Sequence, residues 1–306
     1  MTFLSEFLRS TIMMSTTFLL AGIGTVFGER AGVVNIGIEG IMLVGSLAGV
    51  IGSWMSGSVW VGMLLAMAGG LLVALLFAFF SVRLYSNQIV VGVAINILAI
   101  GLTVLIYRGI FGVNGDIPEI DTFHAVAVPL LSRIPFIGSA LFDQPIPVYI
   151  AYILVPLCSF IMNRTNIGLK VRSVGNNPMA CDTVGLNVSR IRFGAVAYTG
   201  IMAGFAGAFL STGQLSAFTE NMVSGRGYIV IAAVACGNYT PVGVFLSSLM
   251  FGASEALEYR LQVINQSVPT EIWAMLPYII TLIALCVYQK KSNRPACSGT
   301  NYERQG

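Results

Sequence analysis

The longest polar stretch of the chain, residues Asn163–Arg192, reads NRTNIGLKVRSVGNNPMACDTVGLNVSRIR. It separates two apolar runs, Ile146–Met162 and Phe193–Thr212. Both runs are close to the roughly 20 mostly apolar residues that a helix needs to cross a bilayer. The stretch holds five basic residues and a single acid, Asp182. Long apolar runs joined by a short basic connection predict a helical membrane protein with this stretch on one face of the membrane.

The composition supports a chain that lies mostly in the membrane. Charged residues make up 9% and hydrophobic residues 56% of the 306 positions, whereas soluble domains carry about 25% charged residues. The five cysteines are scattered, and His124 is the single histidine. The sequence therefore indicates no disulfide framework and excludes a histidine-based metal site. We expect no metal, no cofactor and no nucleic-acid partner for this chain.

Apolar runs recur along the whole chain, and we expect an all-α polytopic fold with about 8–10 transmembrane or re-entrant helices. Two runs are irregular: Ile36–Ser53 is rich in glycine and Tyr228–Cys236 is short. Either could be a broken or re-entrant helix, which is tolerated where it is buried in protein or lines a cavity. The candidate runs are Thr11–Phe27, Ile36–Ser53, Val59–Val82, Ile89–Phe111, Ile146–Met162, Phe193–Thr212, Tyr228–Cys236, Pro241–Leu257 and Ile272–Tyr288.

The placement of the basic residues predicts the orientation. Residues 163–192 and the tail with Lys290, Lys291 and Arg294 concentrate them, so both are expected in the cytoplasm. We divide the chain into one transmembrane domain, residues 1–290, and a cytoplasmic tail, residues 291–306. The side of the N-terminus depends on whether Ile36–Ser53 spans the membrane or dips back, and both alternatives stay open.

Residues Asn177–Gly185 contain the signals of one short helix. Asn177 suits the N-cap, Pro178 suits the first helical position, and Gly185 suits a left-handed exit. A short capped helix on the basic face suggests a surface on which another protein docks. The alternative is an ordinary cytoplasmic connection.

The motif Met179-Ala180-Cys181, followed by Gly185, resembles the E-A-A-x-x-x-G loop of ABC importer permeases. In that family the loop is a short cytoplasmic helix that sits in a cleft of the ATPase. Here Met179 stands at the acidic position and Cys181 at the second alanine. The resemblance implies that the coupling residues are Asn177, Pro178, Met179, Ala180, Cys181, Asp182 and Gly185.

Other segments resemble the simple-sugar and nucleoside branch of the same permeases, in the same order along the chain. The smaller permease subunit of bacterial nucleoside importers is the most similar type. The matching segments are Glu29–Gly40 (ERAGVVNIGIEG), Val174–Ala180 (VGNNPMA), Gly225–Ile229 (GRGYI), Gly237–Gly243 (GNYTPVG) and Leu276–Tyr278 (LPY). A weaker similarity between Glu29–Gly37 and Ser224–Ile229, each before a Gly-rich apolar run, suggests an internal repeat of the kind transporters carry.

The resemblance implies partners and a location. We expect a separate ABC ATPase, a second related permease subunit, an extracytoplasmic substrate-binding lipoprotein, and a multi-pass position in the bacterial cytoplasmic membrane, in contact with lipid. The implied substrate is a nucleoside, preferably a purine nucleoside, or a simple sugar.

Several polar residues lie within or beside apolar runs, where ionisable groups are costly and usually functional. Arg226 has three candidate roles: pairing with Glu220, pairing with Glu39, or anchoring at the outer surface. Asn96 is expected to join helices to one another. Glu255 and Glu258 are expected to pair locally with Arg260. The candidate pathway or gating residues are Asn35, Gly37, Glu39, Gly40, Asn96 and Arg226.

The sequence contains no P-loop, no G-x-S-x-G elbow and no H-E-x-x-H motif. We therefore expect a transport subunit that is not itself an enzyme, with ATP hydrolysis on the partner. The alternative is a self-contained secondary transporter or channel for a small neutral polar solute, for which Glu39 is the clear candidate for an ion-coupling group.

Overall fold

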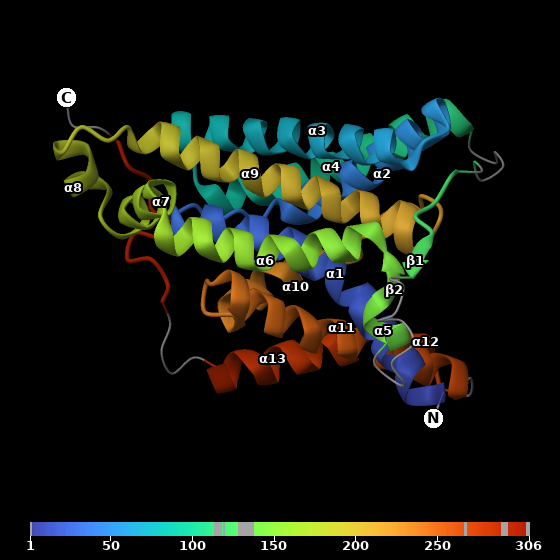
Figure 1. The fold of residues 1–306 in the computed structure, drawn as a ribbon. Helices are drawn as coiled ribbons and strands as arrows, with labels where there is room; N and C mark the ends of the chain where they lie inside the picture. The colour runs from blue at the N-terminus through green and yellow to red at the C-terminus, as the bar shows by residue number, and fades with distance from the viewer. Residues whose placement is uncertain are drawn as a thin grey trace.

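The computed structural model describes residues 2–112, 118, 120–127, 138–265, 268–288 and 293–303. Helices dominate these residues, as expected (Figure 1). The lone sheet among them is a short antiparallel pair, β1 (Ala125–Ala127) and β2 (Asp143–Pro145), next to α5 (Gly138–Phe142). The connection 112–145 holds the acidic residues Asp116, Glu119, Asp121 and Asp143 against Arg133 and is expected outside the cell; of these, Asp116, Glu119 and Arg133 lie outside the described residues.

Six helices within the described ranges are long and apolar enough to cross a membrane. Four of the first five predicted runs keep their bounds within a few residues, and Thr11–Phe27 belongs to a longer helix. The six are α1 (Thr2–Arg30), α2 (Ile38–Ser56), α3 (Val59–Ala78) with the π-helix Phe79–Arg83, α4 (Gln88–Phe111), α6 (Ile146–Arg164) and α9 (Val188–Ala208) with the π-helix Phe209–Gln214. The Gly-rich run around α2 is therefore a continuous helix of 19 residues.

The last three predicted runs differ from simple spans. The run Tyr228–Cys236 forms α10 (Arg226–Cys236), whose 11 residues cover about 16 Å, roughly half of a hydrocarbon core. The next run forms α11 (Pro241–Ile264), which extends seven residues beyond the predicted Leu257. The final run is split at Met275 into α12 (Thr270–Ala274) and α13 (Leu276–Tyr288). Pro277 explains the break, because it has no N–H to donate to the preceding turn.

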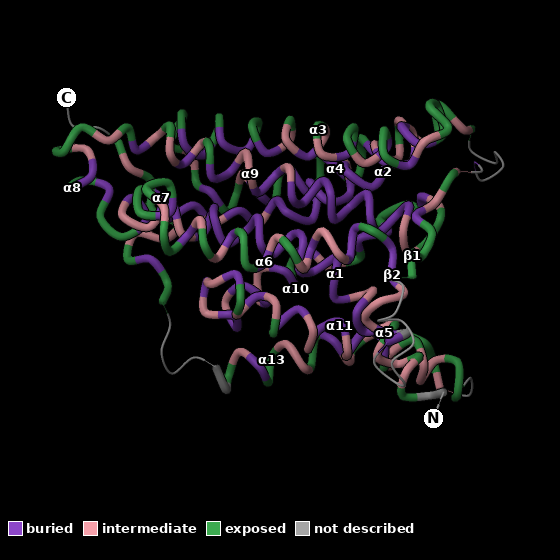
Figure 2. Tube along the Cα trace, viewed as in Figure 1, coloured by how far each residue is buried: buried purple, intermediate pink, exposed green. Residues whose placement is uncertain are grey.

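The helices lie in layers around α1 (Figure 1). α2, α3, α4 and α9 lie on one side of it, and α10, α11 and α13 on the other. In the apolar window of α1 89% of the residues are buried, against 28% for α3 and α4. Figure 2 shows the buried residues along α1 and the core-facing turns of α9, and exposed residues on the outer turns of α3. Thus α1 is the central helix, and α3 and α4 present apolar side chains outward.

The molecule has two distinct ends. One end carries α7 (Asn166–Asn176), α8 (Pro178–Thr183) and residues 293–303, and is called here the α8 end. The other, the N-terminal end, carries the start of α1, the β1–β2 pair and α12 (Figure 1). The two ends of the chain therefore lie at opposite ends of the bundle.

Small residues set the contact between α2, α3 and α9. A Cβ added to Gly45 would lie 2.7 Å from the Cα of Gly204, and one added to Gly70 would lie 2.8 Å from the same atom. Polar side chains add cross-helix hydrogen bonds, since Ser46 donates to the Gly207 carbonyl at 3.0 Å and Thr199 to the Gly24 carbonyl at 2.8 Å. Small residues and such bonds are the usual cause of close packing between membrane helices.

Candidate functional site

The predicted short helix is present as α8, and its capping signals are used as expected. The Asn177 side chain accepts a hydrogen bond from the Ala180 N–H at 3.0 Å, and Pro178 occupies the first turn. Gly185 ends the helix with φ of +84°, the left-handed conformation that favours glycine. The stretch contains one helix more than predicted, because Thr165 caps α7 by accepting from the Gly168 N–H at 3.3 Å.

The faces of α8 differ in exposure. Met179 is 63% exposed, whereas Cys181 is 6% exposed and packs with Val174 and Val188. Burial raises the pKa of the Cys181 thiol, so it stays protonated and acts as a small hydrophobe. The two departures from the family motif therefore lie on different faces: Met179 points outward and Cys181 fills the base of the helix.

Residues 293–303 pack onto the α8 end. The Cys297 N–H donates to the Gly175 carbonyl at 3.0 Å, and the Gly299 N–H to the Gly32 carbonyl at 3.0 Å. Arg192, which is buried, donates to the Ala31 carbonyl at 3.2 Å and to the Thr300 carbonyl at 2.9 Å. Segments distant in sequence are thus joined around the base of α8.

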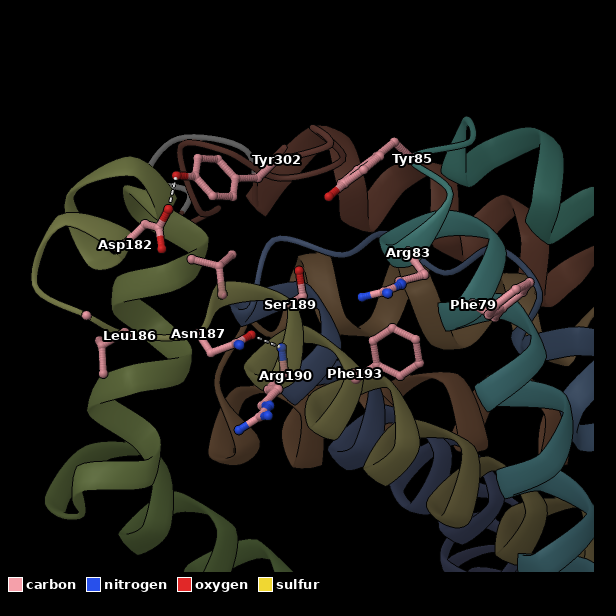
Figure 3. Close-up of a pocket in the computed structure, with 12 residues that line it drawn as sticks. Phe79, Arg83, Tyr85, Asp182, Leu186, Asn187, Ser189, Arg190, Phe193 and Tyr302 are labelled. Atoms are coloured by element: carbon pink, nitrogen blue, oxygen red, sulfur yellow. Dashed lines mark hydrogen bonds between the residues drawn. The ribbon is translucent and has the colours of Figure 1, made fainter. Parts of the chain in front are cut away.

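A hollow of about 830 Å³ lies beside α8 (Figure 3). Its wall includes Asp182 and Gly185, the start of α9, and Arg83 from the end of the π-helix that follows α3. Tyr302 donates its hydroxyl to the Asp182 carboxylate at 3.0 Å, which ties residues 293–303 to α8. The α8 end therefore presents an exposed helix beside a concave surface with arginine on its wall.

A second group of predicted residues meets between α2, α4 and α10. The buried Glu39 carboxylate accepts from the N–H groups of Gly225 and Gly227, both at 2.7 Å. These groups belong to the start of α10, where a negative charge is favoured by the helix dipole. Asn96 accepts from the Gly40 N–H at 2.8 Å and donates to the Tyr228 hydroxyl at 2.9 Å. Asn96 also donates to the Ile36 carbonyl at 3.1 Å and so links the two segments of the suggested repeat, which stays a prediction.

Asn35 and Gly37 belong to the same region. The Asn35 side chain accepts from the Gly37 N–H at 2.9 Å, and a Cβ on Gly37 would lie 3.4 Å from the Cα of Gly92 in α4. The structure thus places Asn35, Gly37, Glu39, Gly40 and Asn96 in one packed joint. Asn96 joins helices, as the sequence predicted.

Arg226 lies beyond that joint, and it pairs with neither Glu220 nor Glu39, the two candidate partners that the sequence left open. It pairs with Glu255 of α11 through Nε and Oε1 at 2.7 Å, and the two side chains are 13% and 7% exposed. Glu220 instead pairs with Arg108 at 2.7 Å. Glu39 is occupied by the α10 amides, which explains why it is not the partner of Arg226.

The expected local pairing of Glu255 and Glu258 with Arg260 is also wrong. Arg260 lies 3.8 Å from Glu6 of α1 and stacks over the Phe7 ring, while Glu258 accepts from Gln262 at 3.1 Å. Arg226 lines two adjoining cavities of about 350 and 200 Å³ between α1, α10, α11 and α13. Across the described ranges, no three His, Cys, Asp or Glu side chains are grouped to hold a metal ion.

Fold and site define a class: a multi-pass helical membrane subunit with one short helix, α10, inside the bundle and an exposed capped helix, α8, at one end. The chain matches the model of the branched-chain amino acid transport system permease component over residues 7–285, and it belongs to that family. It is thus a non-enzymatic permease subunit of an ABC transport system, and the predicted class is confirmed.

Named relatives cover almost the whole chain. The guanosine ABC transporter permease NupQ of Bacillus subtilis is 34% identical, over 98% of this chain and 97% of its own. The nucleoside ABC transporter permease NupC of Lactococcus lactis is 33% identical over 95% and 94%. The putative glucose ABC transporter permease TsgC13 of Haloferax volcanii is 34% identical over 93% and 92%.

Proposed function

We propose that this chain forms part of the pathway of an ATP-driven importer for nucleosides, with purine nucleosides as the preferred substrates. Relatives similar over nearly their whole length include a guanosine permease and a nucleoside permease. A glucose permease of equal identity makes simple sugars the competing substrate class. The observation that carries the importer assignment is α8, an exposed helix with an N-cap and a left-handed exit, in a permease without a nucleotide motif.

In this proposal α8 is the coupling helix and the α8 end faces the cytoplasm. The polar stretch at this end has five basic residues against Asp182, an excess typical of cytoplasmic connections. At the other end Arg9, Arg108 and Arg260 each lie within 4 Å of a carboxylate. The N-terminus then lies outside. The ATPase engages Asn177–Gly185, a second related permease completes the pathway, and a binding protein delivers substrate at the N-terminal end.

Closure of the ATPase dimer would move α8, and through it α7, α9 and residues 293–303. Because Arg192 ties the start of α9 to the turn after α1, this motion reaches the central helix directly. From α1 it passes to α10 and α11, which pack against α1. The joint around Glu39 and the broken helix α10 are therefore the parts we expect to switch between inward-open and outward-open states.

Substitution at Gly185 tests the coupling role. Proline cannot adopt a φ of +84°, and it removes the N–H that bonds to the Asp182 carbonyl at 2.9 Å. We expect Gly185→Pro to insert in the membrane but to lose ATPase co-purification and ATP-driven uptake in proteoliposomes. Gly185→Asn is the control, because asparagine tolerates the left-handed region, and it should retain both.

Two results would contradict the proposal. One is normal ATPase binding and uptake by Gly185→Pro. The other is uptake by this chain alone, driven by an ion gradient and indifferent to ATP, which would favour a secondary transporter.

A further inference from the structure

The cavity around Arg226 lies where a broken helix begins. Residues 215–225 are not helical, and α10 starts at Arg226 inside the bundle. The larger hollow, about 350 Å³, and the smaller, about 200 Å³, share Arg226, Glu255 and Tyr259 on their walls. The volume of the larger hollow is within the range of small-molecule sites, which begins near 300 Å³, and the smaller hollow adjoins it. Discontinuous membrane helices commonly mark such sites in transporters.

The polar groups of this cavity are held in place before any ligand arrives. Arg226 donates from Nε to Glu255 and from Nη2 to the Tyr259 hydroxyl, at 2.7 and 3.2 Å. Its Nη1 donates to the Met222 carbonyl at 2.9 Å. Tyr278 of α13 donates to the Ser224 carbonyl at 3.0 Å, which fixes its ring over the start of α10. Groups locked by such bonds bind a ligand with little loss of side-chain freedom.

The charges on the wall select against anions. Glu220, Glu255 and Glu258 line the larger hollow together with Arg226. Arg226 is compensated by Glu255, and Glu220 by Arg108. That leaves Glu258, which accepts one hydrogen bond, from Gln262, among the described residues, whereas a carboxylate offers about four acceptor positions. A phosphate would be repelled here, while ligand hydroxyl groups can donate to Glu258.

The aromatic groups favour a ligand with a ring system. Tyr259 and Tyr278 line the cavity, and both are exposed. Nucleobases stack on such rings with little dependence on which base is present. Hydroxyl acceptors and exposed aromatic rings in one cavity match a ribose joined to a base better than a sugar alone.

We propose that this cavity is the intramembrane substrate site and that it takes an unphosphorylated nucleoside. The ribose hydroxyls donate to Glu258, and the base stacks on Tyr278. The Arg226–Glu255 pair forms a fixed part of the cavity wall. Because Glu255 neutralises Arg226, the site carries no free positive charge on this pair that would attract the phosphate of a nucleotide. This proposal rests on the proposed importer function and adds the location and the selectivity of the site.

The test is protection of a thiol in the complete transporter, reconstituted with its ATPase and second permease. The binding protein is left out, since it would set the apparent affinity in uptake. Thr219→Cys places a thiol on the cavity wall, and Ser56→Cys, at the exposed last residue of α2, is the control at the same end. An impermeant maleimide is applied with guanosine, ribose or guanosine 5′-monophosphate, and labelling at each position is read by peptide mass spectrometry.

We expect guanosine to protect residue 219, ribose and the monophosphate to protect it far less, and residue 56 to be labelled under all conditions. When Tyr278→Ala is added to the Thr219→Cys variant, the guanosine concentration that protects half of the thiols at residue 219 should rise about tenfold. This is the order expected for the loss of one base-stacking contact. Tyr278→Phe keeps the ring and loses only the hydrogen bond to Ser224, so it should raise that concentration far less than Tyr278→Ala does. Glu258→Gln should raise that concentration about as much as Tyr278→Ala does and allow the monophosphate to protect.

Absence of protection by guanosine, equal protection by ribose, or equal protection by the monophosphate in the parent would overturn the proposed site. ATP-driven guanosine uptake is measured in the same preparation with the binding protein restored. Guanosine uptake without protection refutes the proposed cavity alone, whereas absence of ATP-driven guanosine uptake refutes the proposed nucleoside importer itself.

Discussion

At the scale of single residues, α8 offers a matched pair of substitutions. Met179 is exposed and Cys181 is buried, two positions apart on the same short helix. We expect Met179→Ala to weaken ATPase binding several-fold with little change in thermal stability, because an exposed apolar side chain at an interface contributes mainly to docking. Cys181→Ala should leave ATPase binding unchanged and cost about 1 kcal/mol of stability. Pull-down with the ATPase and thermal unfolding in detergent measure the two effects.

Glu39 gives a second prediction at this scale. Glutamine at this position brings an NH₂ group, which cannot accept from the N–H of Gly225 or Gly227, so one buried donor loses its partner. We expect Glu39→Gln to destabilise the protein by about 1–3 kcal/mol. Glu6→Gln, at a largely exposed acid 3.8 Å from Arg260, should change stability by less than about 0.5 kcal/mol. Equal unfolding temperatures for the two variants would show that the carboxylate is not needed as a cap.

Local signals were enough to predict the cap of α8 and its glycine exit, because each depends on one residue and its neighbours. The partner of Arg226 could not be predicted in the same way. Glu255 lies on another helix, and only the packing of α10 against α11 brings it near. Buried charges in membrane proteins are usually paired, so an acidic partner for Arg226 is expected. From the sequence alone, several acidic residues were equally good candidates.

At the scale of helices, the contact of α2, α3 and α9 depends on Gly204. The motif Gly200-x-x-x-Gly204 is the sequence signal for this close helix packing. A Cβ on Gly204 would collide with the Ala66 backbone, so we expect Gly204→Ala to cost about 1–3 kcal/mol. Gly101→Ala in α4 meets nothing within 4 Å and should be neutral or slightly stabilising. Thermal unfolding in detergent compares them, and equal losses would exclude close packing as the cause.

Hydropathy predicted the long helices of the first half well, because their apolar runs continue from end to end. It was less informative after α9. There, α10 is short and is held by contacts with Glu39 and α11. The helices α12 and α13 are separated by a break at Met275 that Pro277 explains. The short apolar run identified α10 as irregular. Hydropathy does not reveal which residues accept hydrogen bonds from the free backbone N–H groups at the start of such a helix.

At the scale of the whole molecule, the opposite placement of the two chain ends makes orientation testable. In intact cells an impermeant maleimide should label Glu6→Cys and Ser56→Cys, at the N-terminal end, and should not label Val184→Cys, beside α8. Inside-out vesicles should reverse the pattern, because the positive α8 end is expected in the cytoplasm. Labelling of residues 6 and 184 from the same side would contradict the topology.

The segment 293–303 has a consequence for how the protein is made. It bonds to the turn after α1, to the last turn of α7, to Arg192 in α9, and through Asn301 to Gln88 at the start of α4. All of these are synthesised earlier than the segment that ties them together. A nascent chain that has just emerged past α13 contains all the membrane helices described above, but the base of α8 still lacks the hydrogen bonds from residues 293–303. We therefore expect the ATPase to bind only after residues 293–303 have been synthesised, so that incomplete permease chains do not recruit it.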